Sequence, residues 1–218
     1  MKALIFYGGW DGHEPGPVSE ILEKALLGKG FEVERVGSLD PLLDKDKLMG
    51  LDLIVPFWTM GEMPDEAWKN LDEAIRSGVG LGGVHGGAGD AFRGNLEFQW
   101  MVGGQFVGHP HVGEYEVRLT DVQSPITAPL PQSFKYTSEQ YYMQTDPGNV
   151  VLADTVYEHD GRSVVMPVVW TKTWGAGRVF YSALGHCEKE FADYPEVLAM
   201  TTRGFCWAAK GCQGCCCG

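Results

Sequence analysis

The chain has 218 residues, of which 44% are hydrophobic and 21% charged, a composition that favours one folded domain and excludes a disordered chain. Its formal net charge is −12, and no run of lysine and arginine offsets the acidic character. Because such a surface repels phosphate backbones, nucleic acid is excluded as an expected partner.

Membrane and secretion signals are not expected either. The sequence contains no stretch of about eighteen apolar residues that could form a transmembrane helix. The apolar start at 1–7 gives way to Gly8 and Gly9 after a few residues, which is shorter than a signal peptide requires. We therefore expect a cytoplasmic protein without a membrane partner.

The first half of the chain alternates strand and helix patterns. Continuous apolar runs closed by glycine predict strands buried on both faces, and apolar residues at helical spacing predict the helices between them. Such alternation implies right-handed crossovers and a mostly parallel sheet with helices on both faces. The expected strands are 3–7, 31–36, 51–58 and 79–85; the helices begin near Pro17 and Pro64 and end before Gly28 and Gly78.

The second half indicates an antiparallel extension of the same sheet. Alternating patterns predict strands at 113–120 and 150–157, and a hairpin joins 164–173 to 178–184. A last helix is expected at 195–210. The predicted fold class is therefore α/β, a flavodoxin-like doubly wound sheet in a single domain, 1–210.

Six cysteines fall into two groups, two within the expected domain and four in the tail, 211–218. A disulfide framework would spread cysteines through the fold, so secretion is not implied. The tail thiolates could bind a soft metal, but adjacent cysteines do not easily face one ion. We expect a flexible, functionally incidental tail, with cysteines Cys212, Cys215, Cys216 and Cys217.

Most histidines lie where a parallel sheet places its ligands, beyond the carboxyl ends of the strands. His13 follows the first strand, His85 ends the fourth and His186 ends the last, whereas His159 lies in a surface turn. Two more lie just past a short helical segment around Trp100. Any one of these histidines alone is more often structural or solvated, but their common placement predicts that at least three share one site.

His85 lies in Gly83-Val84-His85-Gly86-Gly87, the small-residue pattern of a tight, strained turn from strand to helix. Acyl-enzyme chemistry would need cysteine or serine at its centre. An imidazole there can instead transfer protons or bind a metal. In the alternative interpretation, the glycines only allow close packing and His85 caps the next helix.

Several short motifs resemble the ThuA (trehalose-utilisation) family over nearly the whole chain before the tail. The family is similar in fold to class I glutamine amidotransferases but lacks their catalytic cysteine, and the resemblance implies a role in carbohydrate metabolism. The glycine-rich stretch 87–90 departs from the family pattern. The matching stretches are 83–87, 102–110, 124–127, Glu139 with Tyr141, 177–181, 184–186 and 203–209.

We expect His85, Glu139 and His186 to be the catalytic residues that transfer protons. A carboxylate beside several imidazoles can act as a general base, as a metal ligand or as the partner that fixes a tautomer. For Glu139, the alternative of a solvated charge on a strand stays open.

His109 and His111 are assigned to a divalent metal or to the substrate. Pro110 separates them, so in an extended loop both would reach one ion only if the chain bends there. Imidazole and carboxylate ligands suit zinc, nickel, iron or manganese and do not choose among them. Such a metal would activate water or stabilise developing oxyanion charge.

Trp10, His13 and Tyr141 are expected to contact the substrate, a small-molecule carbohydrate, with the Trp10 indole stacked on a sugar ring. A nucleotide cofactor is not expected, because the sequence has neither a phosphate loop nor a dinucleotide fingerprint. Hydrolysis, elimination and isomerisation of a sugar or an oxidised sugar derivative stay open, as does a homo-oligomeric state.

Two other functional classes are compatible with parts of the sequence. A non-catalytic module that binds or senses a sugar would show saturable binding without product. A cysteine-dependent amidotransferase using Cys187 is disfavoured, because Cys187 does not lie in a strand-to-helix elbow.

Overall fold

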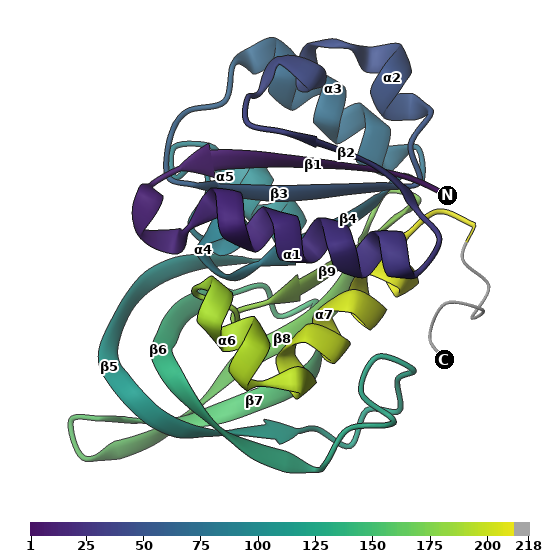
Figure 1. Ribbon diagram of the computed structural model, residues 1–218. Helices are drawn as coiled ribbons and strands as arrows, with labels where there is room; N and C mark the ends of the chain where they lie inside the picture. Colours follow the sequence, from purple (N-terminus) through teal and green to yellow (C-terminus); the bar gives the residue numbers. More distant parts are fainter. Residues whose placement is uncertain (212–218) are drawn as a thin grey trace.

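One nine-stranded sheet organises the computed structural model, which describes residues 1–211 (Figure 1). The strand order is β2-β1-β3-β4-β9-β8-β7-β5-β6, parallel from β2 to β9 and antiparallel from β9 to β6. The predicted flavodoxin-like α/β fold with an antiparallel extension is confirmed. The four tail cysteines lie outside the described residues. Within 1–211, no helix is long and apolar enough to cross a membrane.

The parallel half carries helices on both faces, with α1 and α7 on one side and α2 and α3 on the other (Figure 1). Its strands are β1 (Lys2–Gly9), β2 (Glu32–Val36), β3 (Leu53–Thr59), β4 (Gly80–Val84) and β9 (Gly177–Ser182). Its longer helices are α1 (Pro15–Gly28), α3 (Asp65–Arg76) and α7 (Pro195–Ala208). The short ones are η1 (Asp11–His13), η2 (Asp40–Leu43), α2 (Lys45–Met49), α4 (His85–Gly89), α5 (Leu96–Val102) and α6 (Glu188–Asp193).

The glycines of β4 let α7 approach the sheet closely. A Cβ at Gly80 would lie 2.2 Å from the Ala208 carbonyl oxygen, and one at Gly82 would lie 2.4 Å from the Phe205 ring. Every residue of β4 is buried. The central strand that ends at His85 is therefore held between layers, which gives its last residue a rigid support.

The antiparallel half consists of β5 (Gly104–Leu119), β6 (Ser133–Thr145), β7 (Val150–His159) and β8 (Arg162–Trp174). Strand β6 was not predicted from the sequence, because buried polar residues such as Ser138 and Gln140 break its apolar alternation. Strand β5 begins earlier than predicted, since Pro110 argues against a strand. Figure 1 shows both strands as a long arch beside the carboxyl ends of the parallel strands.

Candidate functional site

The site begins at the point where the sheet changes winding direction, between β1 and β3. Strand β1 pairs with β2 on one side and β3 on the other, and open α/β sheets bind ligands beyond the carboxyl ends of the strands at such a point. His13 follows β1 in η1 and is buried, with 3% of its surface exposed. Its Nδ1 lies 2.7 Å from the Thr59 hydroxyl at the end of β3. The two strand ends thus hold the first imidazole together.

His85 occupies a strained turn between β4 and α4, as the sequence predicts. Its φ of 44° is in the left-handed region, and its side chain is fully buried. The Nδ1–H donates to the Ala183 carbonyl oxygen at 2.7 Å, because a carbonyl only accepts. In the neutral ring, Nε2 therefore carries the lone pair that faces the site. The Tyr141 ring covers His85 at a centroid distance of 4.1 Å.

His186 is held by contacts that involve its backbone. Its N–H donates to Glu190 Oε2 at 2.7 Å, and the Tyr136 hydroxyl makes a short hydrogen bond to the same carboxylate. The Tyr136 oxygen also accepts from the Gly185 N–H at 2.9 Å. Glu190 is 8% exposed, so this loop is anchored to both α6 and β6 in a buried environment.

Replacing Glu190 with alanine is expected to lower the free energy of unfolding by about 1–3 kcal/mol, because the His186 N–H and the Tyr136 hydroxyl lose a buried acceptor. Glu190→Gln keeps an acceptor oxygen and is expected to lose less. Urea denaturation of both variants measures the difference. An alanine variant as stable as the wild type would show that these contacts do not hold the loop.

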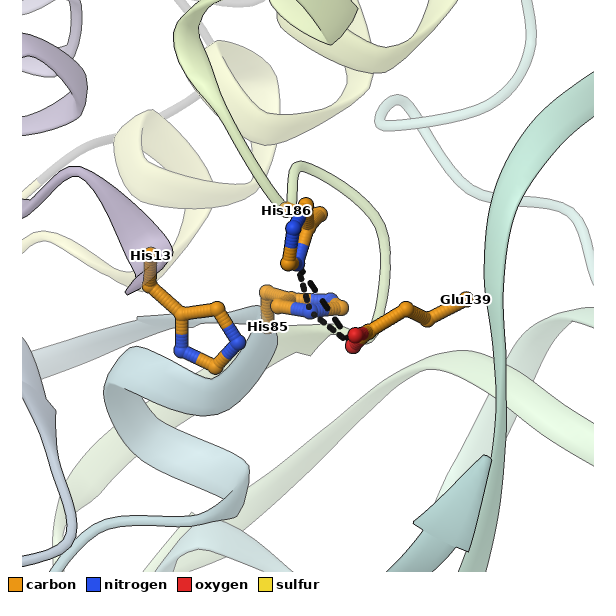
Figure 2. Close-up of side chains that lie close together, drawn as sticks. All are labelled: His13, His85, Glu139 and His186. Carbon is orange, nitrogen blue, oxygen red and sulfur yellow. Dashed lines mark hydrogen bonds and ion pairs between the residues drawn. The ribbon is translucent and has the colours of Figure 1, made fainter. Parts of the chain in front are cut away.

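Glu139 reaches the histidines from β6, on the arch (Figure 2). Its Oε2 lies 3.3 Å from His85 Nε2 and 3.5 Å from His186 Nδ1, and those two nitrogens are 3.3 Å apart. The His13 ring packs edge-on against both other rings, with centroid distances of 4.8 Å to His85 and 5.0 Å to His186. We call His13, His85, Glu139 and His186 the histidine–glutamate cluster.

The cluster displaces the pKa values of its members in different directions. Burial, with the nearby His85 and His186, lowers the pKa of His13 to about 3, so this ring is neutral at physiological pH. Burial alone would raise the pKa of Glu139, but hydrogen bonds from His186 and His85 outweigh it and lower that pKa below its usual range. The hydrogen bond to Glu139 raises the pKa of His186.

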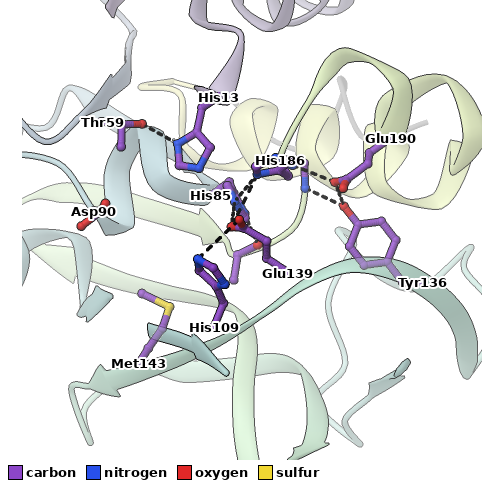
Figure 3. A network of polar contacts seen from close by, with 12 residues as sticks. His13, Thr59, His85, Asp90, His109, Tyr136, Glu139, Met143, His186 and Glu190 are labelled. Atoms are coloured by element: carbon purple, nitrogen blue, oxygen red, sulfur yellow. Dashed lines mark hydrogen bonds and ion pairs between the residues drawn. The ribbon is translucent and has the colours of Figure 1, made fainter. Parts of the chain in front are cut away.

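A β-bulge separates the two histidines assigned to a metal. Gly108 pairs with Tyr142 and His111 with Gln140, so β5 has one extra residue beside Pro110. His109 Nε2 therefore lies 3.5 Å from Glu139 Oε1 (Figure 3), whereas the exposed His111 contacts the Glu114 carbonyl oxygen. The structure brings His109 to the edge of the cluster and leaves His111 outside it.

Two other residues that were expected to contact the substrate, Trp10 and Tyr141, lie in different places: Trp10 at the exposed edge of the cluster, which we call the rim, and Tyr141 in the interior. Trp10 is 47% exposed, and its ring lies 4.8 Å from that of His13, so its indole lines the rim. Tyr141 is buried behind His85 and presents little surface to a ligand.

Burial raises the pKa of the Cys187 thiol, which weakens this cysteine further as a nucleophile.

Sequence reasoning missed three residues that hold the cluster: Thr59, Tyr136 and Glu190. Thr59 ends a parallel strand, so the rule that placed His13 and His85 could have found it. Glu190 is the third residue of α6, at the capping-box spacing from Cys187, which is a readable signal. Tyr136 has no local signal, because its partners are distant in sequence.

Each member of the cluster offers one ligand atom, and these four atoms lie within 4.8 Å of one another. Three nitrogens and a carboxylate oxygen form a donor set that can pass protons or hold a transition-metal ion. The arrangement has no hydroxyl or thiol in the position of a nucleophile, since His85 occupies the elbow.

The family model described as "ThuA: Trehalose utilisation" matches residues 2–208. A ThuA-like protein from Bacteroides uniformis is similar with a TM-score of 0.75 and 21% identity, over 95% of this chain and 91% of that chain. A ThuA-like protein from Parabacteroides merdae has a TM-score of 0.72 and 22% identity, over 95% and 89%. A cytoplasmic protein from Salmonella typhimurium has a TM-score of 0.65 and 12% identity, over 96% and 100%.

At such identities the structural neighbours show the fold alone. The search of curated proteins gave no match. The family model, in contrast, covers both halves of the sheet and every residue of the histidine–glutamate cluster. The chain therefore belongs to the ThuA family, whose description as trehalose utilisation gives it a role in carbohydrate metabolism.

Proposed function

We propose that this protein is an enzyme of carbohydrate breakdown that acts on a sugar or an oxidised sugar derivative. The observation that carries the proposal is the convergence of three imidazoles and the Glu139 carboxylate where the sheet changes winding direction. Open α/β sheets bind ligands at this point. Membership of the ThuA family supports a carbohydrate as the substrate.

The chemistry we propose is proton transfer, in which one group of the cluster donates a proton and another accepts one. His186 holds its proton more tightly than a free histidine does, because Glu139 raises its pKa, and it can supply that proton to a leaving oxygen. In its neutral form His85 presents an Nε2 lone pair beside Glu139, and either group can accept a proton from a sugar hydroxyl. Hydrolysis, elimination and isomerisation all use such an acid–base pair.

Trp10 and His109, at the exposed edge of the cluster, supply the contacts expected for a sugar ring. Half-exposed Trp10 offers an apolar indole face beside His13, which suits stacking against the C–H face of a pyranose. His109, with 41% of its side chain exposed, offers an imidazole N–H to a hydroxyl. Because the Salmonella neighbour is described as cytoplasmic, we propose the same location for this chain.

His186→Gln is expected to lower kcat by about 10²- to 10⁴-fold, the usual contribution of a general acid or base. The wild type is first incubated with trehalose, its component glucose and their oxidised keto forms, and products are separated by chromatography. His159→Gln is the matched control, because His159 is 59% exposed and lies outside the cluster. Equal kcat values for wild type and His186→Gln would contradict the proposal.

The competing proposal is a non-catalytic module that binds or senses a sugar. It predicts that calorimetry detects saturable sugar binding while no substrate in the panel is converted. In that case Trp10→Ala would weaken sugar binding. Neither the wild type nor His186→Gln would form any product.

A further inference from the structure

Three donor atoms of the histidine–glutamate cluster form a nearly equilateral triangle. Its edges join His85 Nε2, His186 Nδ1 and Glu139 Oε2 and measure 3.3, 3.3 and 3.5 Å. A tetrahedral ion with bonds of about 2.0–2.1 Å to nitrogen and oxygen has ligand–ligand edges of about 3.3–3.4 Å. The spacing therefore matches one face of a metal coordination shell, and His13 supplies a fourth donor within 4.8 Å of the others.

The hydrogen bonds behind two of the rings leave the Nε2 atoms of both rings on the side of this triangle. His85 donates its Nδ1–H to the Ala183 carbonyl, so Nε2 is the free nitrogen. His13 contacts the Thr59 hydroxyl through Nδ1, so its Nε2 faces the cluster, and this Nε2 carries the lone pair when Nδ1–H donates to the hydroxyl. Partners of this kind are typical of metal-binding histidines, because they fix the tautomer and strengthen the donor.

The same orientation means that the centre of the cluster must hold either a proton or a cation. When the His85 ring is neutral, its Nε2 lone pair and the Glu139 carboxylate are both acceptors at 3.3 Å, and they form a hydrogen bond only when Nε2 also carries a proton. Within residues 1–211, the ion pairs of Glu139 are formed with histidines alone. A proton on His85 or His186 can satisfy the Glu139 carboxylate, and a divalent cation can satisfy all four donors at once.

We propose that His13, His85, Glu139 and His186 bind one divalent first-row transition ion, in place of the proton shared by His186 and Glu139. This inference deepens the proposed function and concerns the same site, but assigns the metal to a different set of residues from the His109 and His111 pair that the sequence suggests. His109 contacts the second carboxylate oxygen and so orients Glu139. The donor set suits zinc, nickel, iron or manganese, and an ion there would polarise a sugar oxygen or activate water.

Two members of the cluster are partly exposed to solvent. The side chains of His186 and Glu139 keep 24% and 15% of their surface exposed, while His13 and His85 are buried beneath them. An ion can therefore reach the cluster from solvent through these two side chains.

The test uses Co²⁺ as the probe on full-length protein freed of metal with a chelator. Wild type is expected to bind one equivalent with the visible d–d absorption of nitrogen and oxygen ligands. His13→Gln is expected to weaken that binding by about 100-fold or more, since even indirect partners of metal ligands contribute about 10- to 100-fold. His111→Gln is the matched control and is expected to bind like wild type.

The outcomes separate this inference from the proposed function. Loss of binding in His111→Gln but not in His13→Gln would overturn the inference, as would the absence of d–d absorption in wild type. A near-ultraviolet thiolate-to-cobalt absorption that His13→Gln leaves unchanged, with no d–d bands from nitrogen and oxygen ligands, would place the ion on cysteines and also overturn it. Turnover of a sugar by protein that binds no Co²⁺ would refute the metal site and leave the acid–base enzyme standing.

Discussion

His85→Asn is expected to lower kcat by about 10²- to 10⁴-fold and to abolish tight Co²⁺ binding, because it removes the Nε2 lone pair at the centre of the cluster. Asparagine is chosen since it tolerates the left-handed backbone of this turn better than alanine does. The variant separates the imidazole from the turn that carries it. Steady-state kinetics on the best substrate of the panel and a Co²⁺ titration measure the two effects.

The control for His85→Asn is His111→Asn, which makes the same chemical change on the exposed part of β5. Thermal unfolding of both variants shows whether the elbow has kept its structure. A folded His85→Asn protein with wild-type kcat would contradict both the acid–base role and the ligand role of this residue.

Gly86→Ala is expected to disturb the cluster without removing any titratable group. A Cβ at this position would lie 2.2 Å from Cε1 and 2.6 Å from Nδ1 of His13, so the ring must move and its hydrogen bond to Thr59 must lengthen. Since a displacement of about 1 Å at a catalytic group can cost about 100-fold, we expect a kcat loss of that order. The overpacking should also lower stability by about 1–3 kcal/mol.

Gly16→Ala is the matched control, because an added Cβ there meets nothing within 4 Å and alanine suits the first turn of α1. Urea denaturation and kinetics are compared for the two glycine variants. A Gly86→Ala protein with wild-type kcat and Co²⁺ affinity would mean that the position of His13 is unimportant to the site.

The carboxyl-end rule explains why much of the site could be predicted. Buried apolar runs and helical spacing are local patterns, so they indicate the strands before His13 and His85 directly. Once the sheet is known to be parallel, the ends of its strands meet at one edge, and the loops that follow them become neighbours. The left-handed turn at His85 was likewise readable, because the glycines around it are contiguous in the sequence.

The position of Glu139 beside the histidines could not be predicted from local sequence patterns. Its strand pairs with β5 at the far edge of the sheet, and it meets His85 across 54 positions of sequence. The family resemblance drew attention to this glutamate, but no local pattern says which face of β6 it occupies. That face depends on register, and a shift of one residue would turn the side chain away from the histidines.

The amino-acid sequence by itself determined the order of the elements, the parallel core and the placement of His13, His85 and His186 at one end of it, because hydrophobic periodicity and chain direction are local properties. Only the tertiary structure decided that Glu139 joins them, that the bulge beside Pro110 sends His109 and His111 to different places, and that Glu190 and Tyr136 hold the last loop. Strand register and side-chain packing between distant segments arise when the whole sheet forms.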